Sequence, residues 1–139
     1  MNTRVVLDAA AFDVIDTARG QALRGLLRRA SERDAEVCCA AVTLAEVCRD
    51  LARTRRVEAC LARSRGGRRI RVVPTDERLA KLVGAILHNT RSGSEMLGDA
   101  HVVAVCTGAD TAVVVTSDPD DVTRLGAAVP GVRIVTRAP

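Results

Sequence analysis

Four carboxylates of this sequence lie in or directly beside apolar stretches, where an ionised side chain needs a partner. They are Asp8, Glu46, Asp99 and Asp118. A carboxylate in such surroundings must be protonated, paired with a base or bound to a cation. Few basic residues neighbour these acids along the chain, so a shared divalent metal is the simplest way to compensate their charge. Sites made only of acidic oxygens suit hard cations that keep several waters.

Each acid also has a simpler interpretation as part of a helix cap. Asp8, Asp99 and Asp118 each stand just before an expected helix, where a carboxylate commonly accepts hydrogen bonds from the first turn. Glu46 follows Thr43 by three residues, which is the spacing of a capping box. Taken singly, each acid favours capping. Taken together, four acids at strand ends and helix starts, spread widely through the chain, favour a folded metal site.

Five short apolar runs are expected to form the strands that position these acids. They span residues 4–7, 37–42, 70–73, 112–116 and 132–135. Apolar runs of this length are typical of parallel strands buried on both faces. With helical patterns between them, they predict a three-layer α/β/α sandwich around a central, mostly parallel sheet of four to five strands. In such sheets ligands bind beyond the carboxyl ends of the strands, where Asp8 and Asp118 are expected.

Longer segments with helical spacing separate the strands. One carries a leucine stripe at Leu23, Leu26 and Leu27, with arginines on its other side. A second is expected over residues 43–51. Later helices are expected to begin near Thr75, Asp99 and Pro119. Because no internal repeat and no long linker interrupts this pattern, we expect a single domain over residues 1–139.

The composition narrows the kinds of partner. The 139 residues carry a formal net charge of +4, and all but one of the 21 basic residues are arginine, the exception being Lys81. Guanidinium groups match phosphate oxygens, which suits a polyanion, although a GC-rich genome would give the same bias. Phe12 is the only aromatic residue. This excludes an aromatic cage and the stacked-aromatic platform of many single-strand binders.

The cysteines and the apolar stretches suggest a cytoplasmic protein. Five cysteines, an odd number, lie in apolar patterns without CxxC spacing, and His88 and His101 lie at no ligand-like spacing from them. We therefore expect buried thiols in a reducing compartment rather than a zinc site. We expect no signal peptide and no membrane-spanning segment, since no apolar stretch approaches about 18 residues.

Four motifs, taken in order, resemble those of the PIN-domain family and, more narrowly, those of VapC-type toxins of type II toxin–antitoxin systems. They lie at residues 5–9, 42–47, 99–104 and 115–121, and each contains one of the four acids. The similarity extends over nearly the whole chain. The order and spacing of the motifs are more specific than any motif alone.

The resemblance implies a Mg²⁺-dependent endoribonuclease, with Mn²⁺ as a substitute ion. Its catalytic pocket would be formed by the four acids, with Asp8, Asp99 and Asp118 as metal ligands. Glu46 would orient or deprotonate the attacking water. Thr116 is expected to support the site with a hydroxyl hydrogen bond.

The resemblance also implies partners: an RNA substrate, a cognate antitoxin whose carboxy-terminal tail occludes the pocket, and a homodimer. The leucine-striped helix could supply an exposed apolar face for the dimer. Arginines between the second and third strands are expected to form a phosphate-binding rim beside the acids, with a solvated helical face as the alternative. They are Arg53, Arg55, Arg56, Arg63, Arg65, Arg68, Arg69 and Arg71. A structured RNA such as tRNA or an rRNA loop fits the lack of aromatic residues best.

One departure from the family pattern leaves an alternative open. Ala10 stands two residues after the first acid, where many relatives carry Ser, Thr or Asn. The missing hydroxyl is consistent with a catalytically weak or inactive binding module that acts through RNA or protein contacts. A phosphotransfer receiver-like domain is a further alternative, but it needs a lysine after a late strand, and Lys81 falls within a helical pattern. Because all four acids are present, we expect an active enzyme. Asp121 could be an extra acid of the site, but we expect it to be a solvated residue of a first helical turn.

Overall fold

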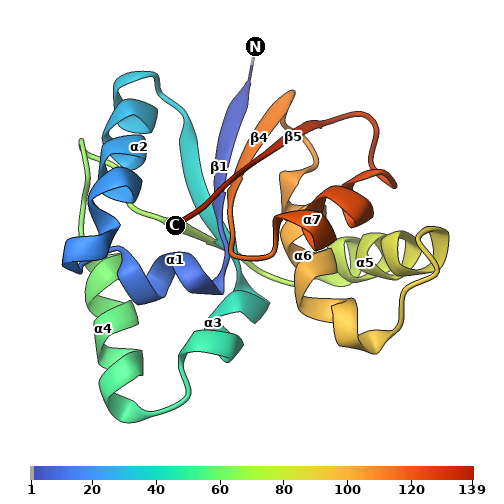
Figure 1. Cartoon of the computed structure of the whole chain (residues 1–139), viewed down its shortest axis with the longest axis horizontal. Helices are drawn as coiled ribbons and strands as arrows, with labels where there is room; N and C mark the ends of the chain where they lie inside the picture. The colour runs from blue at the N-terminus through green and yellow to red at the C-terminus, as the bar shows by residue number, and fades with distance from the viewer. Residues whose placement is uncertain (1) are drawn as a thin grey trace.

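The computed structural model describes residues 2–139 and places five strands in one sheet (Figure 1). The strands are β1 (Thr3–Leu7), β2 (Glu36–Ala40), β3 (Arg71–Val73), β4 (Thr111–Val115) and β5 (Arg133–Arg137). Their order across the sheet is β3-β2-β1-β4-β5, and every neighbouring pair is parallel. The predicted α/β class with a central parallel sheet is confirmed.

The central strand β1 shows why these apolar runs become strands. Val5 and Leu7 pack into the core on one face of the sheet, whereas Val6 packs into the core on the other. Successive side chains of a strand point to opposite faces, so a strand covered on both faces must be apolar throughout. Leu7 pairs with Val115 of β4, which means that the residues following both strands leave the sheet at the same edge.

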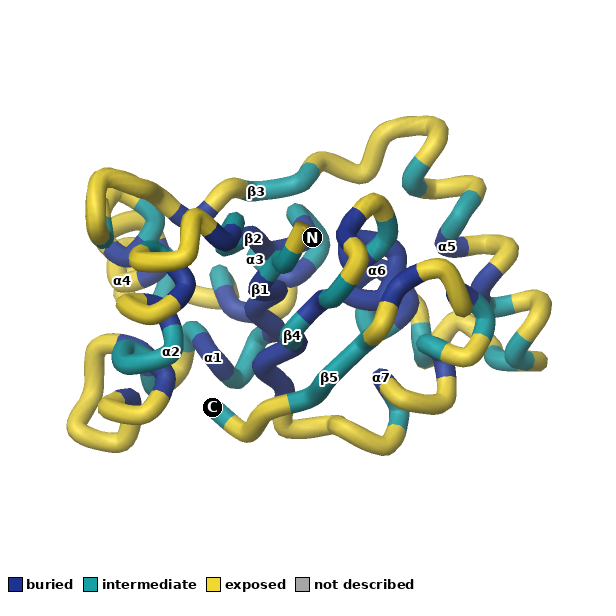
Figure 2. Tube along the Cα trace, turned by 90° about the horizontal axis from the view of Figure 1, so that it is seen from above, coloured by how far each residue is buried: buried dark blue, intermediate teal, exposed yellow. Residues whose placement is uncertain are grey.

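Helices cover both faces of the sheet. They are α1 (Ala9–Val14), α2 (Gln21–Glu32), α3 (Ala41–Val47), α4 (Leu51–Ala62), α5 (Glu77–Asn89), α6 (Leu97–Cys106) and α7 (Pro119–Gly126), with short 3-10 helices η1 (Ala18–Gly20) and η2 (Ser94–Met96). In Figures 1 and 2, α1, α2 and α4 lie on one side of the sheet and α5, α6 and α7 on the other. Helix α3 follows β2 directly and contacts α1 and α6. The three layers of the prediction are therefore present.

Two aliphatic cores, one on each side of the sheet, hold the layers together. The core beneath α6 includes Ala100 and every residue from Val102 to Cys106. The opposite core includes Ile15, Leu23 and Leu27, and Leu26 packs against it. The leucine stripe of α2 thus faces the interior. The expectation that it forms an exposed apolar face for a dimer is wrong, because burial against the sheet already uses it.

The segment expected to be one helix over residues 43–51 is divided into α3 and α4. Helix α3 ends at Val47, and α4 begins at Leu51. The division occurs at Asp50, whose Oδ1 accepts a hydrogen bond of 2.8 Å from the backbone N–H of Arg53. A carboxylate at this position caps a new helix, so the chain changes direction before the arginine-rich segment begins.

The strand expected over residues 37–42 ends at Ala40, and this shifts the start of α3. Thr43 consequently lies inside α3 and not at its N-cap, and its buried hydroxyl has no hydrogen-bond partner within residues 2–139. The capping-box interpretation of Thr43 and Glu46 is therefore wrong, because Glu46 belongs to the last turn of a short helix.

All five cysteines are free thiols, and four of them are buried. Burial raises the pKa of Cys38 to about 12, with the nearby Glu36 carboxylate adding to the effect. The pKa of Cys39 is raised to about 12 by burial as well. Such thiols behave as small apolar side chains. None of the helices described for residues 2–139 combines the length and apolar character needed to cross a membrane.

Candidate active site

The candidate site lies where the strand order changes direction. Strand β2 lies on one side of β1 and β4 on the other, so the connections after β1 and β4 diverge at this edge. Asp8 is the first residue after β1, and Thr116 is the first after β4. An open parallel sheet has its crevice at such a point, because the two crossover helices pack on opposite faces.

Three of the predicted acids meet at this edge of the sheet. One carboxylate oxygen from each of Asp8, Asp99 and Asp118 lies within 4.8 Å of the other two. Asp8 is buried, Asp99 is half-buried in the first turn of α6, and Asp118 is exposed at the start of α7. Residues separated by up to 110 positions are thus brought together by the sheet topology. We refer to these three residues as the aspartate trio.

Asp8 is the most rigidly held member of the aspartate trio. Its Oδ1 accepts a hydrogen bond of 2.7 Å from the backbone N–H of Ala9, and its Oδ2 accepts one of 2.8 Å from the Thr116 hydroxyl. Its own backbone N–H donates to the carbonyl oxygen of Val115 at 3.0 Å. Asp8 therefore caps α1 and belongs to the trio at the same time, so the two interpretations of this residue are compatible.

Thr116 connects two members of the trio. Its hydroxyl donates to Asp8 and accepts a hydrogen bond of 3.0 Å from the backbone N–H of Asp118. The predicted hydroxyl hydrogen bond is thus present. Because both Asp8 oxygens already have donors, the hydroxyl that is missing at Ala10 is not needed to orient this carboxylate. This weakens the argument for an inactive binding module that rested on Ala10.

Asp118 and Asp99 do not act as helix caps. Asp118 occupies the N-cap position of α7, but its side chain makes no capping hydrogen bond within the described chain. Helix α6 begins at Leu97, two residues before Asp99, so the capping interpretation of Asp99 is wrong. Both carboxylates are left available at this edge of the sheet.

Glu46 lies beside the trio, at the end of α3. A Cβ placed on Gly98 would lie 2.6 Å from its Oε1, which shows how closely the Glu46 side chain approaches the first turn of α6. Burial raises the pKa of Glu46, the charges of Asp8 and Asp118 raise it further, and Arg49 and His101 oppose this effect. The structure therefore brings all four predicted acids to one region, three as a tight group and one next to it.

Crowding has its largest effect on Asp99. Burial and the charges of Asp8, Asp118, Asp121 and Glu46 raise the pKa of the Asp99 carboxyl to about 6. Neighbouring carboxylates that cannot all ionise cheaply in one place attract either protons or a cation. The site thus has the electrostatic character of a cation-binding pocket.

Three residues near the acids were not assigned to the site by the sequence analysis. His101 is buried one half-turn after Asp99, and its Nδ1 donates a hydrogen bond of 2.7 Å to the Leu97 carbonyl oxygen. Gly98 provides the space that Glu46 occupies. Asp121 is half-buried and adds to the negative charge around Asp99, so it is not simply solvated. The Gly98–Asp99–His101 spacing at a helix start was the available signal.

Comparison with known proteins places this architecture in a family. The family model described as PIN domain matches residues 5–127. The chain belongs to the PIN-domain family. A chain of the crystal structure of DNA-bound VapBC from Salmonella typhimurium has the same fold, with a TM-score of 0.63 and 21% identity over 98% of both chains. No curated protein gives a significant match. The family prediction is confirmed, and since PIN domains are generally nucleases, membership supports a nuclease.

The donor set of this PIN domain fits a hard divalent cation. Its trio offers carboxylate oxygens only, and the nearest imidazole, that of His101, uses Nδ1 to bind a backbone carbonyl. Mg²⁺ prefers oxygen ligands at about 2.1 Å in octahedral geometry, so its ligands lie within about 4.2 Å of one another. Oxygens that already lie within 4.8 Å need only small side-chain movements to reach this arrangement.

The arginines expected as a rim do not all lie beside the acids. Arg53 pairs with Asp13 of α1, the helix that begins after Asp8. Arg68 pairs with Asp34, which precedes β2, and Arg71 pairs with Glu36 at the start of β2. These last two arginines are therefore at the amino end of the sheet, opposite the trio. The expectation of one continuous rim beside the acids is wrong for this part of the chain.

Proposed function

We propose that this PIN domain is a Mg²⁺-dependent endoribonuclease that hydrolyses RNA phosphodiester bonds, with Mn²⁺ able to replace Mg²⁺. The main support for this proposal is the aspartate trio, which lies at the sheet edge where the strand order changes direction, with Glu46 beside it. We propose that residues 1–139 act as a single PIN domain.

The four acids would have different roles in the reaction. Asp8 and Asp99 would be the nearest ligands of the cation, because Asp8 is locked by Ala9 and Thr116 and Asp99 has a carboxylate free of protein hydrogen bonds within residues 2–139. Asp118 would bind directly or through water. The backbone N–H of Asp118 is held by the Thr116 hydroxyl, which limits movement of its carboxylate.

Glu46 would act on the attacking water. Its raised pKa makes it a better proton acceptor than an ordinary carboxylate, which suits a general base. The water oxygen would form the new bond to phosphorus, and Glu46 would accept the water proton. The bond to the leaving ribose oxygen would break, and this oxygen would take a proton from solvent water. A bound Mg²⁺ would neutralise charge on the scissile phosphate and make the water more acidic.

We further propose that the protein is the toxin of a type II toxin–antitoxin pair. Support comes from the fold that this chain shares with DNA-bound VapBC from Salmonella typhimurium. A cognate antitoxin would place a basic side chain of its carboxy-terminal tail against the trio. We also propose that the protein is a homodimer and that it acts in the cytoplasm. A neighbouring reading frame that encodes a small protein with a DNA-binding amino end would support the pairing.

Cleavage of RNA by the purified chain tests the nuclease proposal. A labelled stem-loop RNA is incubated with Mg²⁺, with Mn²⁺ and with EDTA. Cleavage is expected with either ion and not in EDTA, and Asp99→Asn should lower the rate at least about 1000-fold because a ligand of the cation is removed. Asp120→Asn is the matched control, since Asp120 is exposed in the first turn of α7 and outside the trio. Undiminished cleavage in EDTA, or by a folded Asp99→Asn protein, would falsify the proposal.

A further inference from the structure

Positive charge gathers around helix α2 and the segment 63–69. Arg29 and Arg33 line a hollow beside β1 and β4, whereas Arg24 and Arg28 line a hollow beside the segment 63–69. Helix α2 and the segment 63–69 carry eight arginines, which we call the basic surface. They are Arg24, Arg28, Arg29, Arg33, Arg63, Arg65, Arg68 and Arg69. Three acids belong to the same region, namely Glu32 of α2 together with Asp16 and Asp34, the ion-pair partners of Arg63, Arg65 and Arg68. The basic surface therefore has a net charge of +5. The remaining 13 basic and 14 acidic residues leave the rest of the chain at −1.

The segment 63–69 is folded tightly against α2. It forms a hairpin in which Arg65 and Arg68 exchange backbone hydrogen bonds of 2.7 and 3.1 Å. Gly66 and Gly67 adopt positive φ values of 60° and 82° at its turn. A Cβ on Gly66 would lie 1.8 Å from Ser31 Oγ, and this hydroxyl lies 3.3 Å from the Gly66 carbonyl oxygen. Glycine is therefore required for the close approach that holds the hairpin arginines beside those of α2.

Half of the basic surface is free of protein partners. Arg28, Arg29, Arg33 and Arg69 are exposed and make no side-chain hydrogen bond or ion pair within residues 2–139. A guanidinium without a protein acceptor is available to an external anion. Arg28 lines a hollow between α2 and the hairpin, and Arg69 lines the neighbouring hollow on the other side of Ser31.

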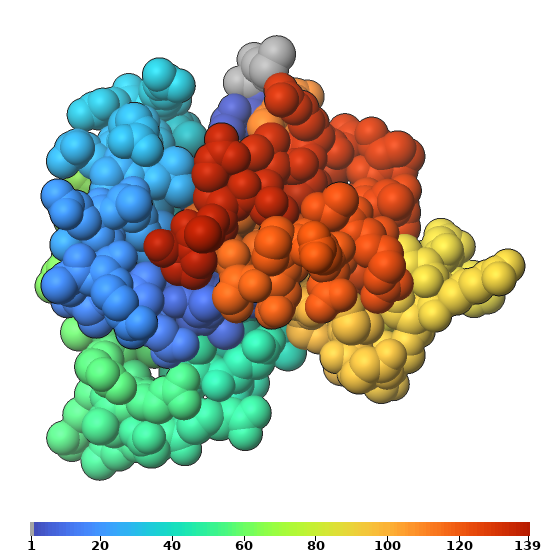
Figure 3. Space-filling model, viewed as in Figure 1, coloured from blue at the N-terminus to red at the C-terminus, as the bar shows by residue number. Residues whose placement is uncertain are grey.

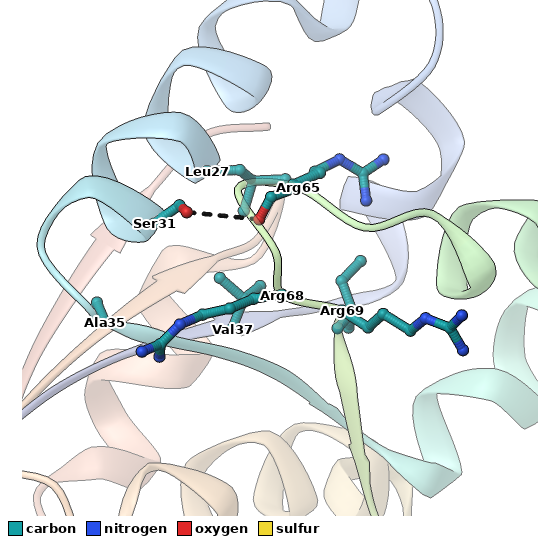
Figure 4. Close-up of a pocket in the computed structure, with 8 residues that line it drawn as sticks. Leu27, Ser31, Ala35, Val37, Arg65, Arg68 and Arg69 are labelled. Atoms are coloured by element: carbon teal, nitrogen blue, oxygen red, sulfur yellow. Dashed lines mark hydrogen bonds between the residues drawn. The ribbon is translucent and has the colours of Figure 1, made fainter.

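The arrangement suits an extended polyanion and not a small one. Figure 4 shows the side chains of Arg65, Arg68 and Arg69 leaving the hairpin in different directions, so they do not converge on one point. The cavity lined by all three has a volume of about 20 Å³, scarcely more than one water needs. The neighbouring hollow, lined by Arg24, Arg28 and Arg65, is about 420 Å³, which is wide enough for part of an extended polyanion. In the space-filling view α2 forms an open surface along one side of the molecule (Figure 3). Diverging guanidinium groups on an open surface can contact successive phosphates of a nucleic-acid backbone.

We propose that the basic surface binds the phosphodiester backbone of the substrate nucleic acid at a distance from the bond that is cut. This inference rests on the proposed nuclease function for the choice of partner. Arg68 and its partner Asp34 lie before β2, whereas the trio lies beyond the carboxyl ends of the strands. The two regions are separated by at least one strand length, about 15 Å. A B-form DNA duplex rises about 3.4 Å per base pair, and an A-form RNA duplex rises less. A substrate that reaches both regions therefore needs at least about five base pairs beyond the cut.

Binding without metal tests this inference independently of cleavage. Dissociation constants for a labelled RNA stem-loop with a ten-base-pair stem, and for the matching DNA hairpin, are measured by fluorescence anisotropy in EDTA across a series of salt concentrations. The variants are Arg28→Gln/Arg69→Gln and, as a matched control, Arg78→Gln/Arg133→Gln. The control removes the same charge from exposed arginines outside the basic surface that have no side-chain partner within residues 2–139.

The basic-surface variant is expected to bind the stem-loop roughly tenfold more weakly near 0.1 M salt. The slope of log affinity against log salt should fall by about 1.5, since each lost phosphate contact removes about 0.7 to 0.9. The control should change the slope by less than half as much. If the variant binds both RNA and DNA more weakly, the surface contacts phosphates alone. If it binds only RNA more weakly, the surface is dedicated to the substrate. Either result supports binding of the nucleic-acid backbone.

Equal binding by the two variants overturns the inference, as does a change in molar mass in solution with RNA affinity unaltered, which would make the surface a protein contact. The nuclease proposal stands or falls separately. A parent protein that binds the stem-loop but cuts no RNA with Mg²⁺ or Mn²⁺ refutes the nuclease proposal and leaves the binding surface in place.

Discussion

The aspartate trio and the basic surface carry opposite charges and differ in how closely those charges are packed and how far they are exposed to water. The trio crowds carboxylates within 4.8 Å of one another in a partly buried site, and the pKa of Asp99 rises to about 6 as a result. Arg65, Arg68 and Arg69 of the basic surface leave the hairpin in different directions (Figure 4), and four of its eight arginines are exposed without a protein partner within residues 2–139. Like charges that are close and desolvated repel strongly, whereas like charges in water interact weakly and are screened by salt. The trio therefore carries an electrostatic cost in the free protein that the basic surface does not.

The largest effect on stability is expected when the hydroxyl that organises the trio is removed. Thr116→Val keeps the side-chain shape but leaves a buried Asp8 oxygen and the Asp118 N–H without their partners. We expect a loss of about 2–4 kcal/mol in the free energy of unfolding, and about 10- to 100-fold in the rate of RNA cleavage. Chemical denaturation and cleavage assays measure the two effects. Thr116→Ser, which retains the hydroxyl, should recover most of both; if Ser and Val behave alike, the hydrogen bonds are not the cause.

Removal of charge from the trio should stabilise the metal-free protein in a pH-dependent way. The folded-state pKa of Asp99 is about 6, above the ordinary value of 3.8, so between these values the folded state holds a proton that the unfolded state has lost. Stability therefore falls as the pH rises through this range, and the cost is complete above about pH 6. Asn does not titrate and avoids this cost.

Asp99→Asn should thus be no more stable than the parent near pH 4 but more stable by about 1 kcal/mol at pH 8 in EDTA. The expected gain in stability is only about 1 kcal/mol for two reasons. Solvent screens the half-exposed Asp99 carboxylate, and its negative charge interacts favourably with the helix dipole at the start of α6. Thermal melts in EDTA and in 10 mM Mg²⁺ provide the test, and only the parent should gain stability from the metal. A variant that is less stable than the parent in EDTA at pH 8 would contradict the electrostatic account.

The location of the acids was predictable from sequence because topology, and not detailed packing, brings them together. Parallel strands share one carboxyl edge, so acids that follow two apolar runs converge whenever those runs are neighbours in the sheet. Asp8 and Asp118 follow this rule directly. Glu46 and Asp99 do not follow a strand. Their apolar surroundings marked them as candidates, and the family resemblance then assigned them to the same pocket as the other two acids.

The distribution of the arginines was not predictable in the same way. Arg53 to Arg71 look continuous in sequence, but Asp50 starts a new helix and the chain then runs back along α4 to the hairpin at Gly66. The end of the segment therefore lies at the opposite edge of the sheet from the acids. The adjacent pair Gly66-Gly67 signalled a turn. Its docking on α2 depends on Ser31, which is 35 residues away from Gly66 in sequence, and no local pattern reveals such a contact.

A smaller effect is expected at Gly98, where the change touches Glu46 and spares the trio. The Cβ of Gly98→Ala would lie 2.6 Å from Glu46 Oε1, the far end of a flexible side chain that can move aside. Alanine also favours the helix, so stability should change by less than about 1 kcal/mol. If Glu46 is the general base, its displacement should lower kcat several-fold with little change in KM. Gly84→Ala, which meets no atom within 4 Å in α5, is the control and should leave kcat unchanged.

The smallest effect on stability is expected at the basic surface. Arg28→Gln/Arg69→Gln removes two exposed charges that have no hydrogen-bond or ion-pair partner within residues 2–139, so the free energy of unfolding should change by less than about 0.5 kcal/mol. Relief of repulsion within a surface of net charge +5 should make any change stabilising, and about 0.5 M salt should abolish it because the charges are screened. Urea denaturation at low and high salt measures both. A loss of more than about 1 kcal/mol at either salt concentration would mean that these arginines stabilise the hairpin. The aspartate trio and the basic surface would then no longer differ in whether their charges lower the free energy of unfolding.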